Sequence, residues 1–99
     1  MGMQGQLPSA AATGANGSLF AKEVLTTIAA AGTYVPPAGN YYAYSIDAGI
    51  VTEVQDSTGT WRTVAAAGVN PGNFETDGTN LRFRQSGGAP GTISTIKLG

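Results

Sequence analysis

The sequence contains no cysteine and no histidine among its 99 residues. Without cysteine it has no disulfide, no thiolate nucleophile and no thiolate-bound zinc or iron–sulfur cluster. Without histidine it lacks the imidazole base of a Ser-His-Asp triad and the two-histidine metal site. These absences exclude several common catalytic and metal centres, and we expect no catalytic residue, no metal site and no cofactor.

Charged residues are also scarce. Lysine and arginine number 5, aspartate and glutamate number 6, and together they are 11% of the chain, against about 25% in ordinary globular domains. The net charge is −1, whereas binding to a nucleic-acid backbone needs several clustered cations. No signal-peptide pattern is present, and no apolar run reaches the ~18 residues of a membrane span. We therefore expect neither nucleic acid nor membrane as a partner.

Large apolar residues are few, with 5 Leu, 5 Ile, 6 Val and 3 Phe. The length fits one small domain, and such domains bury only a modest fraction of their surface. Ordering the backbone costs ~1–2 kcal/mol per residue. Because no disulfide or expected metal compensates, we predict a homo-oligomer, either a trimer or a dimer, in which self-association adds stability.

Residues 1–18 differ in composition from the rest of the chain. They are rich in Gly, Ala and Ser, carry no charge and include Leu7 as their only sizeable aliphatic residue. Such a segment has too little apolar surface to offset its chain entropy alone. We expect a flexible N-terminal arm followed by a single β-domain over residues 19–99. The arm is either a disordered terminus or a segment that orders on a partner through Leu7 and Pro8.

Residues 19–31 fit two kinds of secondary structure. Phe20, Val24 and Ile28 share one face of a helix, with Ser18 and Gly32 as possible caps. The same three residues also share one face of a strand. The β-branched residues between 24 and 28 favour the strand, and the helix stays open as the alternative.

From residue 33 onward, short alternating segments and turn signals predict strands. Strands are expected over 33–35, 41–47, 50–56, 60–66, 79–85 and 92–98. The second and third flank Ala48-Gly49 and are expected to form a hairpin, and the loop 68–78 carries Phe74 as an anchor. Turn signals every ~8–12 residues, without long helical patterns, predict an all-β fold. We expect a small antiparallel β-sandwich or barrel of jelly-roll or Greek-key type.

The alternation also assigns side chains to faces. In residues 79–85, Leu81 and Phe83 point one way, and Arg82 and Arg84 point the other way. Ile93 and Ile96 have opposite parity, which predicts a bulge or a strand buried on both faces. The predicted core residues are Tyr42, Tyr44, Ile46, Val54, Trp61, Leu81, Phe83 and Ile93.

Three chemical patterns are weaker than their structural alternatives. Asn73-x-Glu75-x-Asp77-Gly78 imitates half of a calcium loop, but Arg84 stands where a bidentate Glu should be, which favours a polar turn. Carboxylate pairs for glycoside hydrolysis need a substrate cleft that so small a domain rarely builds. The candidates are Asp47, Glu53, Asp56, Glu75 and Asp77. We therefore expect that the protein is not an enzyme.

Aromatic residues interleaved with arginines form the third pattern, a possible stacking platform for bases or sugars. It comprises Tyr41, Tyr42, Tyr44, Trp61 and Phe83 with Arg62, Arg82 and Arg84. The alternation around Phe83 favours a simpler interpretation, in which solvated arginines flank a buried phenylalanine.

Several stretches carry a resemblance. They are Gly32-Thr33-Tyr34-Val35-Pro36-Pro37-Ala38-Gly39-Asn40-Tyr41-Tyr42, Gly59-Thr60-Trp61 and Asp77-Gly78-Thr79-Asn80-Leu81-Arg82-Phe83. With the Gly/Ala/Thr-rich composition they resemble small β-rich structural proteins of tailed-bacteriophage virions, particularly capsid cement or decoration proteins. The likeness covers roughly residues 24–98. Its motifs are turn-and-strand signatures that tail-fibre and spike modules share.

The resemblance implies a non-enzymatic virion protein that is assembled in the host cytoplasm and docks on the capsid surface. Its partners would be the major capsid protein and further copies of itself. The residues expected to contact a partner are Leu7, Pro8, Leu19, Phe20, Arg82 and Arg84. Two alternatives stay open: a carbohydrate-binding or structural module of a tail fibre or spike, and a small barrel that binds single-stranded nucleic acid. Exposed Tyr41, Tyr42 and Trp61 would favour the first, and retention on a polyanion the second.

Overall fold

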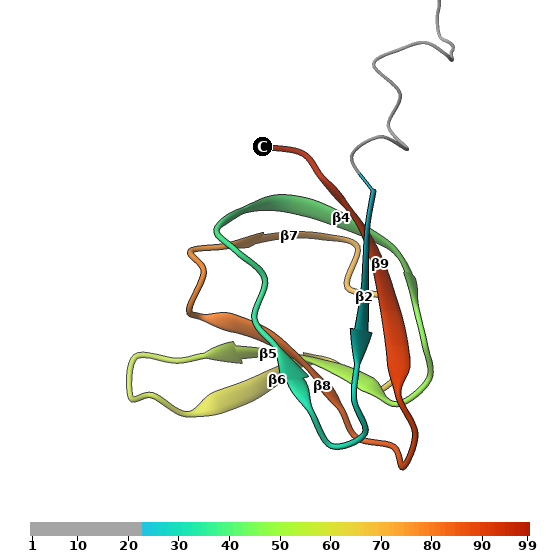
Figure 1. Ribbon diagram of the computed structural model, residues 1–99. Coiled ribbons are helices and arrows are strands. Elements are labelled where there is room, and N and C mark those ends of the chain that lie inside the picture. Colours follow the sequence, from blue (N-terminus) through green and yellow to red (C-terminus); the bar gives the residue numbers. More distant parts are fainter. Residues whose placement is uncertain (1–22) are drawn as a thin grey trace, which may run out of the picture.

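The computed structural model describes residues 23–99, and every regular element in that part of the chain is a strand (Figure 1). The predicted arm and the boundary at residue 19 lie outside this part, as do Leu7, Pro8, Leu19 and Phe20. The strands are β2 (Glu23–Ile28), β3 (Thr33–Tyr34), β4 (Gly39–Ile46), β5 (Ile50–Gln55), β6 (Trp61–Ala65), β7 (Asn73–Thr76), β8 (Leu81–Gln85) and β9 (Gly91–Lys97).

The strands form two four-stranded sheets, ordered β2-β9-β4-β7 and β3-β8-β5-β6, and every pairing is antiparallel. The pairs β2–β9, β3–β8, β4–β7 and β5–β6 are nested around the turn between β5 and β6. The chain is thus one long hairpin wrapped into two layers, which is the topology of a jelly roll. The predicted antiparallel sandwich is confirmed, and the sheets do not close into a barrel.

The predicted hairpin of residues 41–56 is wrong, because β4 and β5 belong to different sheets. The link between them crosses from one layer to the other at Gly49, whose φ is 91°. The Gly49 carbonyl accepts hydrogen bonds from the backbone N–H of Ser86 at 2.8 Å and from its hydroxyl at 2.6 Å. The turn is thereby tied to the end of β8 instead of closing a hairpin.

Replacement of Gly49 by alanine tests this crossing. A side chain at positive φ costs about 1–2 kcal/mol, and a Cβ at Gly49 would also collide with the side-chain carbonyl of buried Gln85. We expect Gly49→Ala to lower the free energy of unfolding by about 2–3 kcal/mol in urea denaturation. Gly72→Ala is the matched control, because Gly72 has φ 72° and a Cβ there would meet nothing within 4 Å. Equal losses in the two variants would contradict the contact with Gln85.

The hydrophobic core lies between the two sheets. Its buried members are Ile28, Ala43, Ile50, Leu81, Phe83 and Ile93, with Tyr34, Ile46, Val54 and Phe74 packed against them. Phe83 has no exposed surface and meets Phe74 edge-on at 5.4 Å between ring centroids. Phe74 in turn stacks on Tyr41 at 5.1 Å. Of the predicted core, Leu81, Phe83 and Ile93 are confirmed as buried, and Ile46 and Val54 as partners of the core.

The prediction of Tyr42 and Tyr44 as core residues is wrong. The pairing of β4 with β9 shifts register between Ala43 and Ser45, so Tyr44 is the extra residue of a bulge. Before the bulge Tyr41 and Ala43 face the core, and Tyr42 is 42% exposed on the outer face. Because a bulge exchanges the two faces of a strand, the alternation read back from Ile46 assigned the preceding tyrosines to the wrong side.

Three other expectations concern single elements. The ambiguous segment contains a strand, Glu23–Ile28, and no helix in its described part. The loop 68–78 contains the short strand Asn73–Thr76, and its Phe74 is an anchor as predicted. Strand β9 runs without a bulge, with Ile93 buried and Ile96 half-buried on the opposite face. A bulge in this strand, one of the two alternatives that their parity predicted, is therefore wrong, and a bulge occurs instead in the neighbouring strand β4.

Candidate docking surface

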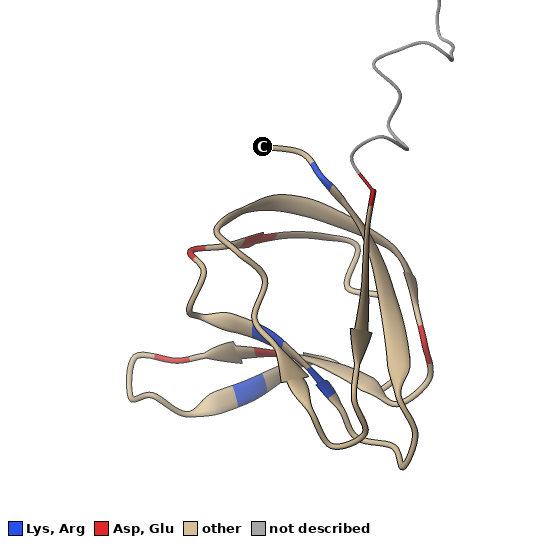
Figure 2. Cartoon of the chain, viewed as in Figure 1, with Lys and Arg blue, Asp and Glu red and all other residues tan. Residues whose placement is uncertain are grey.

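All three arginines of the chain lie on the sheet β3-β8-β5-β6 (Figure 2). Strand β8 is central in this sheet and its residues alternate between buried and half-buried. Leu81 and Phe83 enter the core, and Arg82 and Arg84 lie on the outer face, as the sequence predicted. The two predicted partner-binding arginines are therefore neighbours on one outer surface.

These arginines are joined by a carboxylate that the sequence analysis did not place beside them. Glu53 on β5 is opposite Arg82 in the strand register. Arg82 donates from Nε to Glu53 Oε1 at 2.7 Å, and Arg84 approaches Glu53 Oε2 at 3.2 Å. The Glu53 side chain is only 8% exposed, against 24% for Arg82 and 38% for Arg84.

The ion pairs decide the ionisation of Glu53. Burial alone would raise the pKa of this carboxyl, but hydrogen bonds and charge from both arginines outweigh burial and lower the pKa below its ordinary value. The carboxylate therefore stays ionised at neutral pH and holds both guanidinium groups in place. Solvated arginines beside buried Phe83 were expected, whereas the observed arginines are partly covered and paired.

Trp61 extends the same surface. The Arg82 guanidinium lies over the indole, 4.2 Å from the ring centroid, in a cation–π contact. The prediction of Trp61 as a core residue is wrong. Trp61 lies on the edge strand β6, pairs with Gln55 of β5 and is on the same outer face as Glu53. The Trp61 ring is thus covered by Arg82 and not by core residues. We call Glu53, Trp61, Arg82 and Arg84 the Trp–Arg surface.

The Trp–Arg surface suits recognition of another macromolecule. Its groups are planar and already fixed by mutual contacts, so binding would cost little side-chain entropy. Tryptophan and arginine are also the residues most enriched among those that dominate binding energy at interfaces. The four side chains carry a formal charge of +1, which favours a weakly acidic or carboxyl-bearing partner over a dense polyanion.

Four of the five carboxylates considered for hydrolysis accept hydrogen bonds from the chain's own groups. Besides Glu53, Asp47 accepts from the Thr92 N–H at 2.8 Å. Asp77 accepts from the N–H groups of Thr79 and Asn80 and from the Thr79 hydroxyl. In the calcium-like motif, Asn73–Thr76 is therefore strand β7, and only Asp77-Gly78 begins a polar turn. Over residues 23–99 no three potential ligands gather to hold a metal ion.

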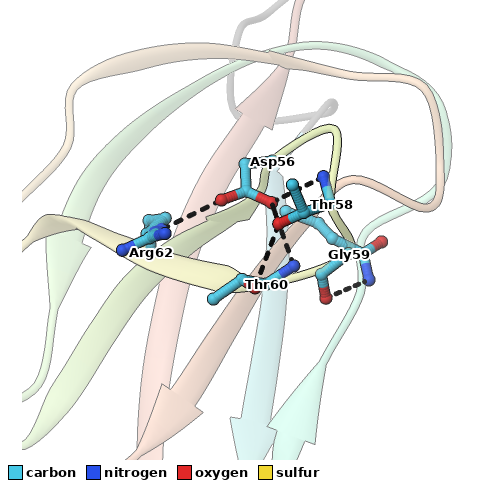
Figure 3. A network of polar contacts seen from close by, with 6 residues as sticks. Asp56, Thr58, Gly59, Thr60 and Arg62 are labelled. Atoms are coloured by element: carbon cyan, nitrogen blue, oxygen red, sulfur yellow. Dashed lines mark hydrogen bonds and ion pairs between the residues drawn. The ribbon is translucent and has the colours of Figure 1, made fainter.

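Asp56 organises the turn between β5 and β6 (Figure 3). One carboxylate oxygen accepts from the Thr58 N–H, the Thr58 hydroxyl and the Thr60 N–H at 2.9, 2.6 and 3.0 Å. The other accepts from Arg62 Nε at 3.0 Å. These bonds lower the pKa of Asp56 from 3.8 to about 2, with the Thr58 hydroxyl and Arg62 as the largest causes.

The lowered pKa values of Glu53 and Asp56 predict that the fold loses stability at low pH. A carboxyl whose pKa is lower in the folded state stabilises the fold above its unfolded pKa and loses this contribution as pH falls through the folded value. For Asp56 the window runs from about 4 down to about 2, and Glu53 acts in the same direction. We expect the melting temperature to fall steadily below pH 4. Asp56→Asn should flatten that part of the curve, and an unchanged curve would contradict the assignment.

A shallow hollow of about 500 Å³ lies beside strands β4 and β7. It is lined by Asn40, Tyr41, Asn73, Phe74, Glu75 and Leu98. Tyr41 is only 4% exposed, and its hydroxyl donates to the Pro37 carbonyl at 2.6 Å. The hollow therefore offers amides and one carboxylate, with little exposed aromatic ring from Tyr41.

Comparison of the chain with protein-family models, with curated proteins and with solved structures found no match. Within residues 23–99 no helix has the length and apolar character needed to cross a membrane.

Proposed function

We propose that this chain is a non-enzymatic structural protein of a phage virion that docks on an assembled capsid and stabilises it. The observation that carries the proposal is the Trp–Arg surface, a fixed, weakly cationic patch on the outer face of a sheet. Jelly rolls occur in viral capsid proteins and in lectin domains, and a fold alone does not decide function. The resemblance of residues 24–98 to capsid cement proteins favours the capsid.

In this proposal the Trp–Arg surface contacts the major capsid protein. Arg82 and Arg84 keep N–H groups beyond those that bind Glu53, and these groups can donate to carboxylates or carbonyls of the shell. The N-terminal arm, with Leu7 and Pro8, adds a second attachment together with Leu19 and Phe20 at the start of the predicted β-domain. The protein would act at the capsid surface, after assembly in the host cytoplasm.

Co-sedimentation with capsid shells stripped of their decoration tests the proposal. Wild-type protein should bind saturably, and Trp61→Ala should weaken binding about tenfold or more, as for an interface residue that contributes at least 1.4 kcal/mol. Val69→Thr is the control, because Val69 is exposed in a loop outside the Trp–Arg surface. Folding of each variant is checked by circular dichroism. Absence of the wild-type protein from the shell pellet would refute capsid docking.

The arm is tested in the same assay. Deletion of residues 2–17 should leave the β-domain folded and reduce occupancy at subsaturating protein. With solvated arginines this deletion would cost more binding than Arg82→Ala combined with Arg84→Ala, because exposed charge pairs are worth only ~0–1 kcal/mol each. The pairing of both arginines with buried Glu53 removes that premise, and the assay therefore compares the two variants directly. Equal occupancy of the truncated and full-length proteins would assign attachment to the β-domain alone.

A carbohydrate-binding role is the second candidate, favoured by the hollow beside β4 and β7. Asn40, Asn73 and Glu75 supply the amide and carboxylate groups that bind sugar hydroxyls, and Tyr42 is exposed on the outer face of the same sheet. Against it, Tyr41 is buried and Trp61 is covered by Arg82. Binding to a glycan array that is lost in Asn73→Ala would favour this candidate over capsid docking.

The nucleic-acid alternative has weaker support. Arg82 and Arg84 share the Glu53 carboxylate, which cancels one of their two charges, and a phosphate backbone is held by several free cations. Retention on a polyanion column at low salt would favour this alternative.

A further inference from the structure

Each of the two sheets has two edge strands, and these four edges differ in how they are protected. Natural proteins protect edges by short strands, bulges, prolines and charges. Strand β3 has two residues and is followed by Pro36-Pro37, and β7 has four residues. Strand β6 carries Arg62, and its pairing with β5 shifts register between Thr63 and Ala65.

Strand β2 has none of these protections along most of its length. It spans six residues, Glu23–Ile28, and its register with β9 is unbroken. Glu23 at its start is its only charge, and it contains no proline. Within residues 23–99 no strand pairs with β2 on the side away from β9. Leu25 in its middle is 63% exposed, the highest value among the large apolar residues there.

We propose that β2 pairs antiparallel with β2 of a second copy across a twofold axis, so that both copies share one continuous eight-stranded sheet. A twofold axis makes the two contributing surfaces identical, and an antiparallel edge can satisfy its own backbone donors and acceptors. This inference does not depend on the proposed capsid function.

The side chains of β2 select one register. Outer faces match only when odd-numbered residues oppose odd-numbered ones. With Leu25 opposite Leu25, the two most exposed apolar side chains cover each other, and Glu23 opposes the second copy's Thr27. With Thr26 opposite Thr26, each Leu25 would face a threonine hydroxyl instead. Because apolar burial favours the first register and no like charges oppose each other in it, we assign Leu25 to the axis.

The N-terminal segment is the competing occupant of this edge. By composition it fits less well, because residues 1–18 are mostly Gly, Ala, Ser and polar residues, whereas EVLTTI is rich in residues that favour strands. The second copy therefore presents the better matched strand.

Sedimentation velocity of the full chain provides the first test. We expect a concentration-dependent dimer, and Leu25→Lys should raise its dissociation constant at least about tenfold by opposing two cations at the axis. Val64→Lys is the matched control, because Val64 is a similarly exposed residue (57%) on the edge strand β6. A wild-type chain that stays monomeric would overturn the proposal. This holds also if the chain dimerises once residues 1–18 are deleted, because the N-terminal segment would then be the occupant of the edge. A dimer that Leu25→Lys leaves unchanged would also overturn the proposal.

Cysteine cross-linking then reports the register, since the native chain has no cysteine. Directly opposed residues have Cα atoms about 4.5–5.5 Å apart, within reach of a disulfide. Leu25→Cys should therefore form a disulfide-linked dimer on mild oxidation. Thr27→Cys should not, because the two copies of residue 27 would be about 13 Å apart along the strands. A dimer that cross-links at position 27 and not at position 25 would refute the assigned axis.

Discussion

Phe83→Ala should lower the free energy of unfolding by about 3–5 kcal/mol, the usual cost of removing a buried phenylalanine. Phe83 has no exposed surface, lies in the central strand β8 and contacts Phe74 from the opposite sheet. A domain of this size has a stability of only ~5–15 kcal/mol, so the loss would leave a marginally folded chain. Urea denaturation followed by tryptophan fluorescence would measure it through Trp61.

Val64→Ala is the control for this prediction. Val64 is 57% exposed at the bulge of β6, and surface substitutions usually change stability by no more than about 0.5 kcal/mol. If Phe83→Ala and Val64→Ala were equally mild, the assignment of Phe83 to the centre of the core would be wrong.

Glu53→Gln is the second large change, with an expected loss of about 2–3 kcal/mol. Removing one member of a fully buried ion pair costs about 3–5 kcal/mol. Here Arg82 and Arg84 are 24% and 38% exposed, and solvent reduces the penalty of leaving them unpaired. The loss should appear at pH 7 and shrink at low pH, where the wild-type carboxyl is protonated as well.

Two further variants isolate the charge at Glu53. Glu75→Gln changes an exposed carboxylate and should be nearly neutral. The triple variant Glu53→Leu, Arg82→Met, Arg84→Met removes all three charges at once and should recover most of the stability lost in Glu53→Gln, because apolar replacements of buried ion networks are often neutral. A triple variant less stable than Glu53→Gln would show that the ion network itself stabilises the fold.

The sequence predicted the regular parts of the fold and failed at its irregular points. In β8 the alternation runs unbroken, so Leu81 and Phe83 were placed in the core and Arg82 outside it. In β4 a single extra residue, Tyr44, exchanges the faces, and Tyr42 was assigned to the wrong one. Nothing in the local sequence marks that bulge, because it arises from pairing with β9.

The connections between the two sheets could not be predicted from the sequence either. Ala48-Gly49 has the composition of a hairpin turn, and the same residues can carry the chain into another layer. In the fold the Gly49 carbonyl is hydrogen-bonded to Ser86, a residue far away in the sequence, so the local residues alone do not distinguish the two connections. Likewise Asn73–Thr76 is short and lies among Gly, Pro and Asn residues, so it was taken as loop.

The candidate docking surface could be predicted only in part. Alternation placed Arg82 and Arg84 on one face, but their shared partner Glu53 lies 29 and 31 residues away in the chain. Glu53 is the one charged residue of strand β5 (Ile50–Gln55), and this was the available signal of an internal ion pair. Trp61 was assigned to the core by the alternation of residues 60–66, because the sequence does not show that β6 is an edge.

The position of β9 has a consequence for how the chain folds during synthesis. In its sheet β9 lies between β2 and β4, yet it is the last of the described strands to be synthesised. Until then β2 has none of its described strand partners, and β4 has only β7. Closing β2 onto β9 joins residues about seventy positions apart, a high contact order of the kind that slows folding to milliseconds or seconds. Folding of this sheet therefore waits until β9 has been synthesised, and a chain truncated before Gly91 would leave the apolar face of β2 exposed to aggregation.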